Sequence, residues 1–235
     1  APFFLPGYAA NIEVGNFDDD MPKLKECDWV VEVVIENMAI KKKLFTEKVV
    51  PNLKDGAILS TNTSGLSVNE MAECLPDHVR KNFLFTHFFN PARYMRLLEI
   101  VNCTFTDPAV TAFMADFISK RLGKGIVYAK DTPNFIANRI GVYAICNCIR
   151  TMMESGMTVE EVDAVAGPAT ARPKSAAFRT ADLVGIDTLR HVAGNSYELL
   201  VNDEQRDIFK FPDFVGEMVS NGLLGNKSKQ GFFKK

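Results

Sequence analysis

The first half of the chain alternates between short apolar runs and amphipathic stretches. Residues 28–36, DWVVEVVIE, form a near-continuous β-branched run, which is typical of a strand buried on both faces of a parallel sheet. Further strands are predicted at 12–17, 57–64, 82–89, 96–103 and 125–130. Helices are predicted between them, at 18–26, 37–53 and 67–75 and from Asp107-Pro108 to Gly123. This order of elements indicates a doubly wound α/β unit.

After residue 130 the pattern predicts helices alone. Asp131-Thr132-Pro133 opens a long amphipathic stretch over 134–155, and helical spacing returns at 185–202 and 212–221. Two pairs have the spacing of a capping box, Ser67 with Glu70 in the first half and Thr158 with Glu161 in the second. We therefore predict an α/β domain with a parallel sheet at 1–130 and an all-helical domain at 131–235.

The composition is that of an ordinary globular protein. Of the 235 residues, 47% are hydrophobic and 24% are charged, and the formal net charge is −2. Nucleic acids and anionic membrane surfaces attract concentrated Lys and Arg, so this charge balance argues against both as partners. No apolar stretch approaches the roughly 20 residues that cross a bilayer, so we expect no membrane insertion.

The five cysteines, Cys27, Cys74, Cys103, Cys146 and Cys148, are irregularly spaced. They form no CxxC pair and no metal-ligand spacing with the three histidines, so the sequence predicts no metal site. An odd count of this kind is typical of reduced thiols in a cytoplasmic protein. The alternative is a catalytic thiol, but no base stands next to any of these cysteines in the sequence.

Polar residues stand where the predicted strands end. Glu36 and Ser64 follow two of these strands, and His87, Asn90 and Glu99 lie on or just after the next two. Each has an ordinary structural explanation, as a turn residue or as an acid on an edge strand. Because ligands bind at the carboxyl ends of the strands in open parallel sheets, the five together predict a site.

A histidine beside a carboxylate is suited to proton transfer. The carboxylate orients the ring, which acts as a general base toward a hydroxyl or, in reverse, as an acid toward a carbonyl. Ser and Asn add neutral donors that hold the reacting oxygen. The sequence contains no GxSxG turn and no P-loop, so the hydrolase and kinase classes lack their central residues.

Three segments in order, TNTSGLSVNEM, THFFNPARYMRLLEIV and KDTPNFIANRI, resemble the signature segments of the NAD-dependent L-3-hydroxyacyl-CoA dehydrogenases of fatty-acid β-oxidation. CDWVVEVVIEN, DLVGIDT and GLLGNKSKQGFF are similar to further parts of that family, and the resemblance covers roughly residues 12–235. It implies a Rossmann-type domain followed by a helical C-terminal domain. It also implies NAD as the cofactor and an acyl-CoA thioester as the substrate.

The same resemblance implies catalytic roles for four residues. His87 is expected to be the catalytic base with Glu99 as its partner, and Ser64 and Asn138 are expected to hydrogen-bond the substrate's 3-oxygen. The family is often dimeric through its helical domain. We therefore expect a homodimer or a part of a multifunctional β-oxidation protein.

Cofactor contacts are expected from Glu36, Lys41, Ser64 and Asn90, with Glu36 and Lys41 near the nicotinamide ribose. Glu32 lies inside the strand predicted at 28–36, where the apolar pattern does not explain a carboxylate. Backbone donors near the cofactor are one explanation for it.

The sequence also departs from the family in two places. The GxGxxG turn that receives the pyrophosphate has no counterpart, since Gly7 and Gly15 make no such turn. We therefore expect a partial Rossmann-type domain, a fragment of a longer polypeptide that is inactive alone, with its first ten residues as a linker. The second departure is Arg172-Pro173-Lys174-Ser175, where the family commonly has a glycine-proline turn, and it leaves the dimer geometry open.

Two other classes of function stay open. The chain could act as a structural or oligomerisation module, or as a dehydrogenase of small hydroxy acids or a crystallin-like relative on the same fold. The joint presence of Ser64, His87, Glu99 and Asn138 favours the enzyme, because a scaffold gains nothing from this set.

Overall fold

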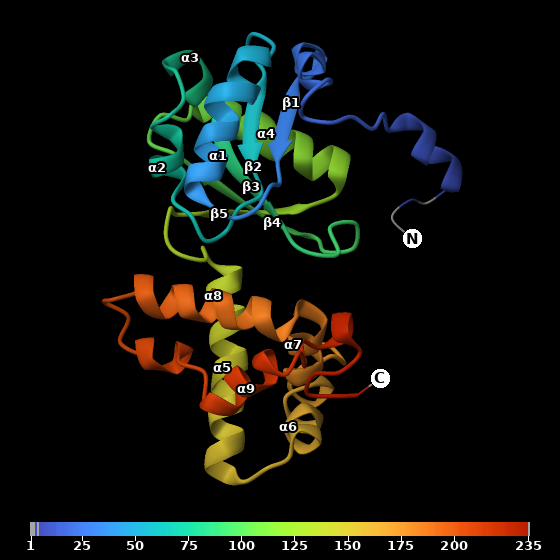
Figure 1. Ribbon diagram of the computed structural model, residues 1–235, viewed down its shortest axis with the longest axis vertical. Helices are drawn as coiled ribbons and strands as arrows, with labels where there is room; N and C mark the ends of the chain where they lie inside the picture. The colour runs from blue at the N-terminus through green and yellow to red at the C-terminus, as the bar shows by residue number, and fades with distance from the viewer. Residues whose placement is uncertain (1–2, 4, 235) are drawn as a thin grey trace. The chain divides into compact units, whose positions relative to one another are not determined.

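The computed structural model describes residue 3 and residues 5–234, and the chain divides into two compact units, Ala1–Phe135 and Ile136–Lys235. Within the described residues all five strands belong to the first unit, and the second is built of helices (Figure 1). The predicted order of an α/β unit followed by an all-helical unit is therefore confirmed. The division follows Phe135, whereas the sequence pattern changes near Lys130.

The first unit is built on one sheet, whose strands are β1 Trp29–Glu32, β2 Ile58–Thr61, β3 Phe83–Phe88, β4 Leu97–Asn102 and β5 Gly125–Ala129. The strands lie in the order β1-β2-β3-β4-β5. The sheet is mostly parallel, as predicted, with one antiparallel pair, β3 and β4. The loop at 89–96 joins these two strands and is shorter than the dozen or more residues that a parallel crossover needs.

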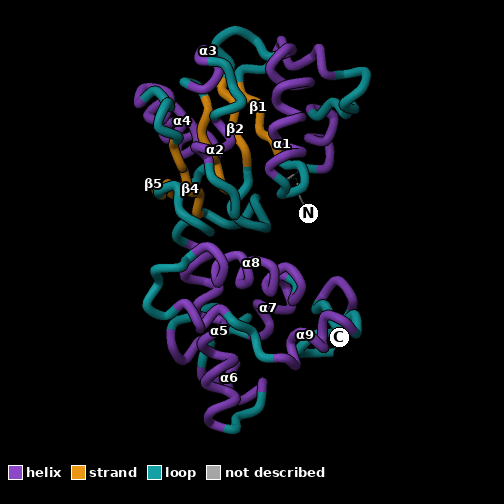
Figure 2. Tube along the Cα trace, turned by 60° about the vertical axis from the view of Figure 1, so that its left-hand side comes forward, coloured by secondary structure: helices purple, strands orange, loops and turns teal. Residues whose placement is uncertain are grey.

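Helices cover both faces of this sheet (Figures 1 and 2). The helices of the first unit are α1 Met38–Leu44, which continues as a π-helix Phe45–Val49 and a 3-10 turn Val50–Asn52, α2 Val68–Ala72, α3 Asp77–Arg80 and α4 Pro108–Leu122. Successive side chains of a strand point to opposite faces. Phe83 and Phe85 therefore pack with α1, α2 and α3, while Leu84 packs against α4. His87 has the parity of Phe85 and lies on the same face.

The strand predicted at 12–17 is wrong. Residues 12–16 form no regular element and pair with no described strand, and Val14 is 88% exposed. Extended backbone becomes a strand only when a neighbour takes up its hydrogen bonds. The helix predicted at 18–26 is a 3-10 helix, Met21–Glu26, with Pro22 in its first turn. Of the predicted N-terminal linker, residues 1, 2 and 4 lie outside the described residues, and Pro6–Asn11 form a 3-10 helix.

β1 is shorter and more exposed than predicted. It ends at Glu32, and Val33 and Ile35 beyond it are each 69% exposed. The turn begins here because the Glu32 carboxylate bends back and accepts the backbone N–H of Val34. The expectation that this segment is buried on both faces is therefore wrong.

The capping box predicted at Ser67 and Glu70 forms only in part. Ser67 Oγ accepts the Glu70 N–H at 3.2 Å, but the Glu70 carboxylate pairs with Lys42 at 3.3 Å. The Asp131 carboxylate, far along the chain, instead accepts the Ser67 hydroxyl and the N–H groups of Val68 and Asn69. The helix that follows, α2, is also shorter than the predicted 67–75.

The helices of the second unit are α5 Ala137–Ser155, α6 Val159–Val165, α7 Phe178–Val184, α8 Ile186–Leu199 and α9 Asp213–Ser220, with 3-10 turns at Pro168–Thr170, Arg206–Phe209 and Asn226–Ser228. They enclose a core that includes the fully buried Ile149, Phe178 and Phe209. The capping box of Thr158 and Glu161 is confirmed at the start of α6. α5 starts later than the predicted 134, because Asn134 and Phe135 have left-handed backbone angles.

Two buried aspartates organise the region at 167–185 and the end of the chain. Asp163 accepts three backbone N–H groups at the start of α7, from residues 177–179, at 2.8–3.1 Å. Asp182 accepts the N–H groups of Phe232 and Phe233 at 2.8 and 2.9 Å. Together they fix α7 and the C-terminal segment, whatever turn stands at 172–175.

Candidate functional site

His87 and Glu99 form a buried pair in the antiparallel β3–β4 ladder, next to the carboxyl end of β3. The register places the two residues directly opposite each other, and His87 Nδ1 lies 2.7 Å from Glu99 Oε2. His87 is 6% exposed and Glu99 is fully buried. The separation of twelve positions in the sequence is thus the result of a tight antiparallel connection. A carboxylate beside Nδ1 favours the imidazole tautomer that is protonated at Nδ1. Nε2 is then the hydrogen-bond acceptor.

Aromatic rings fix the orientation of the imidazole from its own face of the sheet. The Phe89 ring centroid lies 4.4 Å from that of His87, and the Phe135 centroid lies 5.8 Å away. Phe135 is 2% exposed and also contacts Phe85. The His87 ring is therefore held by a carboxylate at one nitrogen and by aromatic rings at its faces and edges.

The loop after β2 carries Ser64 and is tied to both neighbouring strands. The backbone N–H groups of Ser64 and Gly65 donate to the same oxygen of Glu36, Oε1, which follows β1. Asn62 accepts the Phe88 N–H at 2.8 Å at the end of β3. Ser64 is half-buried and Glu36 is exposed. The structure thus brings Glu36 and Ser64 together at the carboxyl ends of β1 and β2, as their sequence positions predict.

Lys41 and Glu32 form an ion pair beneath this loop, with side chains only 1% and 2% exposed. Lys41 Nζ donates to both carboxylate oxygens at 2.7 and 2.8 Å and to the Val34 carbonyl at 3.0 Å. Thr61 Oγ1 also donates to Glu32, at 2.6 Å. Glu32 is therefore held by a lysine and a hydroxyl as well as by the backbone donor expected for it. All three ammonium protons of Lys41 have acceptors inside the protein.

Asn90 begins the exposed loop between β3 and β4. The loop closes on itself through the N–H groups of Tyr94 and Met95, which donate to the Pro91 carbonyl at 2.9 and 3.0 Å. The buried Lys124 donates to the carbonyls of Ala92 and Met95. A lysine from the end of α4 therefore fixes the loop that carries Asn90.

Two sequence comparisons bear on this geometry. Residues 7–132 match the profile described as "3-hydroxyacyl-CoA dehydrogenase, NAD binding domain", and residues 135–235 match "3-hydroxyacyl-CoA dehydrogenase, C-terminal domain". The chain belongs to the 3-hydroxyacyl-CoA dehydrogenase family. Its first unit is accordingly the family's NAD-binding domain, and the resemblance noted in the sequence is confirmed.

Individual members of the 3-hydroxyacyl-CoA dehydrogenase family resemble the whole chain. A probable 3-hydroxyacyl-CoA dehydrogenase of Bacillus subtilis is 50% identical over 235 residues, which are all of this chain and 30% of that protein. A probable 3-hydroxyacyl-CoA dehydrogenase of Deinococcus radiodurans is 44% identical over all of this chain and 67% of that protein. The crystal structure of Mycobacterium tuberculosis FadB2 superposes with a TM-score of 0.83 at 31% identity, over 92% of this chain and 73% of that one. The chain thus spans less than a third of the length of the Bacillus relative.

Asn138, the fourth residue expected in catalysis, lies in the first turn of α5 and belongs to the second unit. It is half-buried, and the next residue, Arg139, forms an ion pair with Asp203 of the same unit. Its role at the site stays a prediction.

The residues at the carboxyl ends of β1 and β2 fit a nicotinamide ribose in chemistry. Toward the residues that the structure describes, Glu36 accepts through Oε1, which leaves Oε2 to accept from a hydroxyl. Thr63 is 5% exposed, and its Oγ1 has no hydrogen-bond partner within the described residues. A buried polar atom without a partner is rare, and this hydroxyl fits a place where a bound group supplies the missing hydrogen bond. Lys41 has no donor left over, and its expected contact with the cofactor stays a prediction.

Three residues near the site are missed by the sequence reasoning: Thr63, Asp131 and Phe135. Thr63 sits between Asn62 and Ser64, but a threonine in a turn carries no specific signal. Asp131 predicts only the start of a helix, yet it caps α2 instead. Phe135 has the pattern of a core residue, and its contact with His87 follows from the tertiary fold alone.

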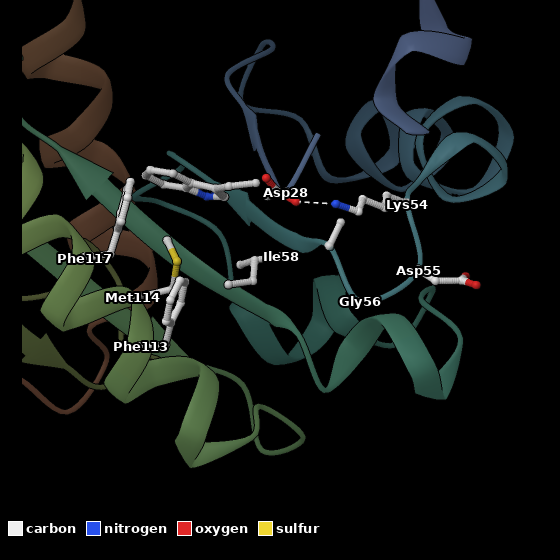
Figure 3. A pocket seen from close by; sticks show the side chains of 10 residues that line it. Asp28, Lys54, Asp55, Gly56, Ile58, Phe113, Met114 and Phe117 are labelled. Atoms are coloured by element: carbon white, nitrogen blue, oxygen red, sulfur yellow. Dashed lines mark hydrogen bonds and ion pairs between the residues drawn. The ribbon is translucent and has the colours of Figure 1, made fainter. Parts of the chain in front are cut away.

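A cavity of about 470 Å³ opens at the opposite end of β1 and β2 (Figure 3). Asp28 and Lys54 pair at its rim, and α4 supplies an apolar wall of Phe113, Met114 and Phe117. These residues lie at the amino ends of the strands, whereas Glu36 and Ser64 follow the carboxyl ends. The cavity is therefore not part of the candidate site.

Metal binding and membrane crossing find no support in the part of the chain that the structure describes. No group of three or more His, Cys, Asp or Glu side chains there is arranged to hold a metal ion. None of the described helices combines the length and the apolar character needed to cross a membrane.

Proposed function

We propose that the protein is an NAD-dependent dehydrogenase that oxidises L-3-hydroxyacyl-CoA to 3-ketoacyl-CoA in fatty-acid β-oxidation. The observation that carries this proposal is the buried His87–Glu99 pair, 2.7 Å apart, in a unit that matches the family's NAD-binding domain. The names of the relatives from Bacillus subtilis and Deinococcus radiodurans support the same reaction class.

In this proposal His87 is the general base. Glu99 accepts a hydrogen bond from Nδ1–H, so Nε2 is unprotonated and takes the proton of the C3 hydroxyl as that carbon is oxidised. Because Glu99 is fully buried and His87 nearly so, water competes little for the proton. In the reverse reaction Nε2 returns the proton to the 3-keto oxygen.

Five other residues complete the proposed site. Ser64 and Asn138 hydrogen-bond the 3-oxygen and hold it toward His87. Glu36, Ser64 and Asn90 hold the nicotinamide end of NAD, and Lys41 completes the expected cofactor set. When bound, NAD supplies the two-electron oxidant for carbon C3.

The proposal is tested with the full-length protein by measuring the reduction of acetoacetyl-CoA by NADH. The reaction is followed by the loss of NADH absorbance. His87→Gln should lower kcat/KM by about 10²–10⁴-fold, the usual contribution of a general base. His191→Gln is the matched control, because His191 is exposed and its ring hydrogen-bonds Asn195 on its own helix at 3.2 Å. A loss of less than about tenfold in His87→Gln would remove His87 from the role of base.

The 235-residue chain by itself is expected to bind NAD weakly and to be inactive. Its sequence contains no GxGxxG turn, whose backbone N–H groups receive the pyrophosphate in this kind of domain. Isothermal titration calorimetry of the chain with NAD tests this point. Tight binding, with a Kd in the micromolar range, would contradict it.

We also propose that the protein works as a homodimer or within a multifunctional β-oxidation polypeptide. The support for the second form is that the Bacillus relative extends far beyond the matched region, which is 30% of its length. Light scattering of the full-length protein gives the assembly, and an assay for enoyl-CoA hydration tests for a second activity.

A further inference from the structure

The segment that leaves β5, residues 131–135, is attached at both ends to the candidate site. Asp131 at its start contacts the helix that follows the Ser64 loop, and Phe135 at its end contacts His87. Neither residue touches the reacting atoms in the proposed mechanism. Both are in contact with elements that do.

The Asp131 carboxylate accepts four hydrogen bonds at the start of α2. Oδ2 accepts from Ser67 Oγ at 2.6 Å, from Asn69 N at 3.1 Å and from Asn69 Nδ2 at 2.7 Å, while Oδ1 accepts from Val68 N at 3.0 Å. A carboxylate is the strongest acceptor for the unpaired N–H groups of a first helical turn. Ser67 is three residues after Ser64. The loop that carries Ser64 is therefore fixed by Glu36 at its beginning and by Asp131 at its end.

Phe135 is held in an unusual backbone conformation by its burial. Its φ is 47° and that of Asn134 is 60°, in the left-handed region that bulky residues rarely adopt. The side chain is 2% exposed and lies in the same hydrophobic cluster as Phe85. Conformations of this kind persist where the surrounding packing determines them, and they are frequent at functional sites. In this conformation the Phe135 ring contacts those of Phe85 and His87.

We propose that Asp131 and Phe135 are positioning residues for the dehydrogenase reaction, Asp131 for the Ser64 loop and Phe135 for the His87 imidazole. This inference rests on the proposed function. Without the Phe135 ring, the His87 imidazole can rotate while it keeps its hydrogen bond to Glu99. Weakening the Asp131 contacts lets the Ser64 loop move relative to β3.

The test compares each variant with a matched control in the full-length protein. Phe135→Leu is paired with Phe45→Leu, because Phe45 is fully buried in the same cluster and contacts Phe83 but not His87. Asp131→Asn is paired with Asp107→Asn, because Asp107 caps α4 by accepting the Ala109 N–H at 2.8 Å. Each control loses a contact of the same kind, an aromatic contact for Phe45 and a helix cap for Asp107, and only one member of each pair lies against the candidate site.

We expect Phe135→Leu and Asp131→Asn to lower kcat on the order of tenfold, with KM for acetoacetyl-CoA changed less than about threefold, as misplacement of a reacting group does. Phe135→Leu should also move the midpoint of the pH–rate profile, since the imidazole environment changes. Phe45→Leu and Asp107→Asn should lower only the melting temperature. Equal kcat in a variant and its control would overturn the inference for that residue.

The outcomes separate this inference from the proposed function. If the wild-type protein is active and His87→Gln is not, while Phe135→Leu behaves as Phe45→Leu does, only the positioning role fails. If the wild-type protein does not reduce acetoacetyl-CoA, the proposed function fails. The position of His87 is then still measured by imidazole ¹H–¹⁵N NMR of the 235-residue chain. Phe135→Leu should shift the His87 ring signals and Phe45→Leu should not, and equal spectra would overturn the role of Phe135.

Discussion

The buried pair of Glu32 and Lys41 allows a stability prediction to be worked from the structure. Lys41→Met keeps most of the side-chain volume but removes the charge that pairs with the Glu32 carboxylate, whose side chain is 2% exposed. Removing one partner of a buried pair costs about 3–5 kcal/mol, because the other charge stays buried without compensation. Thr61 and the Val34 N–H still donate to Glu32, so we expect the lower end, about 3 kcal/mol.

The assay is urea unfolding of the 235-residue chain followed by tryptophan fluorescence. Trp29, the only tryptophan in the chain, lies on β1 and donates to Ser60 at 2.8 Å, so it reports on the first unit alone. With a slope of about 2 kcal/mol per molar urea, the loss moves the unfolding midpoint down by about 1.5 M. Lys43→Met on the same helix is the control. Its side chain is 73% exposed, and it should change stability by less than about 0.5 kcal/mol.

A second substitution distinguishes the ion pair from simple packing. Glu32→Gln added to Lys41→Met removes the uncompensated charge, so the double variant should be more stable than Lys41→Met by about 1–3 kcal/mol. A Lys41→Met variant that loses less than about 1 kcal/mol would refute the reasoning. So would a double variant in which the two losses simply add.

Two further predictions concern titratable groups of the second unit. Burial raises the pKa of the Cys146 thiol to about 12, so a disulfide reagent at pH 8 should modify Cys146 only after unfolding; rapid labelling of the folded protein, mapped by mass spectrometry, would contradict this. A backbone hydrogen bond from Gln205 and then the Arg139 guanidinium lower the pKa of Asp203 below its ordinary 3.8. The resulting stabilisation is present above that ordinary value and is lost as the pH falls through the lowered one. In Asp203→Asn the melting temperature of the second unit should therefore fall less steeply as the pH is lowered. An unchanged dependence on pH would exclude this contribution.

Elements set by local signals follow the sequence closely. The helix from Asp107-Pro108 to Gly123 appears as α4 with the predicted cap, and Gly123 has the left-handed φ of 66° that ends a helix. The strands predicted at 82–89 and 96–103 form with bounds within a residue or two. The opposition of His87 and Glu99 follows from those two strands and the short loop between them. This part of the site is thus predictable from local pattern and loop length.

Features that depend on distant partners are not predictable in the same way. The segment at 12–17 has the alternation of a strand, but no described strand lies beside it, and pairing is a property of the neighbour. Asp131 has the signature of a helix start and serves a helix more than sixty residues earlier in the chain. In both cases the local pattern is present, and the tertiary structure determines whether a strand pairs and which helix an aspartate caps.

The carboxylates around the site explain why polar residues at strand ends are ambiguous in a sequence. The chain leaves a sheet with backbone N–H groups that need acceptors, and a carboxylate is a strong acceptor for several at once. Among the described residues, Glu36 accepts two backbone N–H groups with one oxygen and leaves the other available, whereas Lys41 donates all three of its ammonium protons to Glu32 and Val34. A hydrogen-bond count thus separates two residues that the family resemblance groups together. It favours Glu36 as a direct contact of the cofactor and Lys41 as a support for the turn that carries Glu36. In the full-length protein, Glu36→Gln should therefore raise KM for NADH at unchanged stability. Lys41→Met should mainly lower the free energy of unfolding.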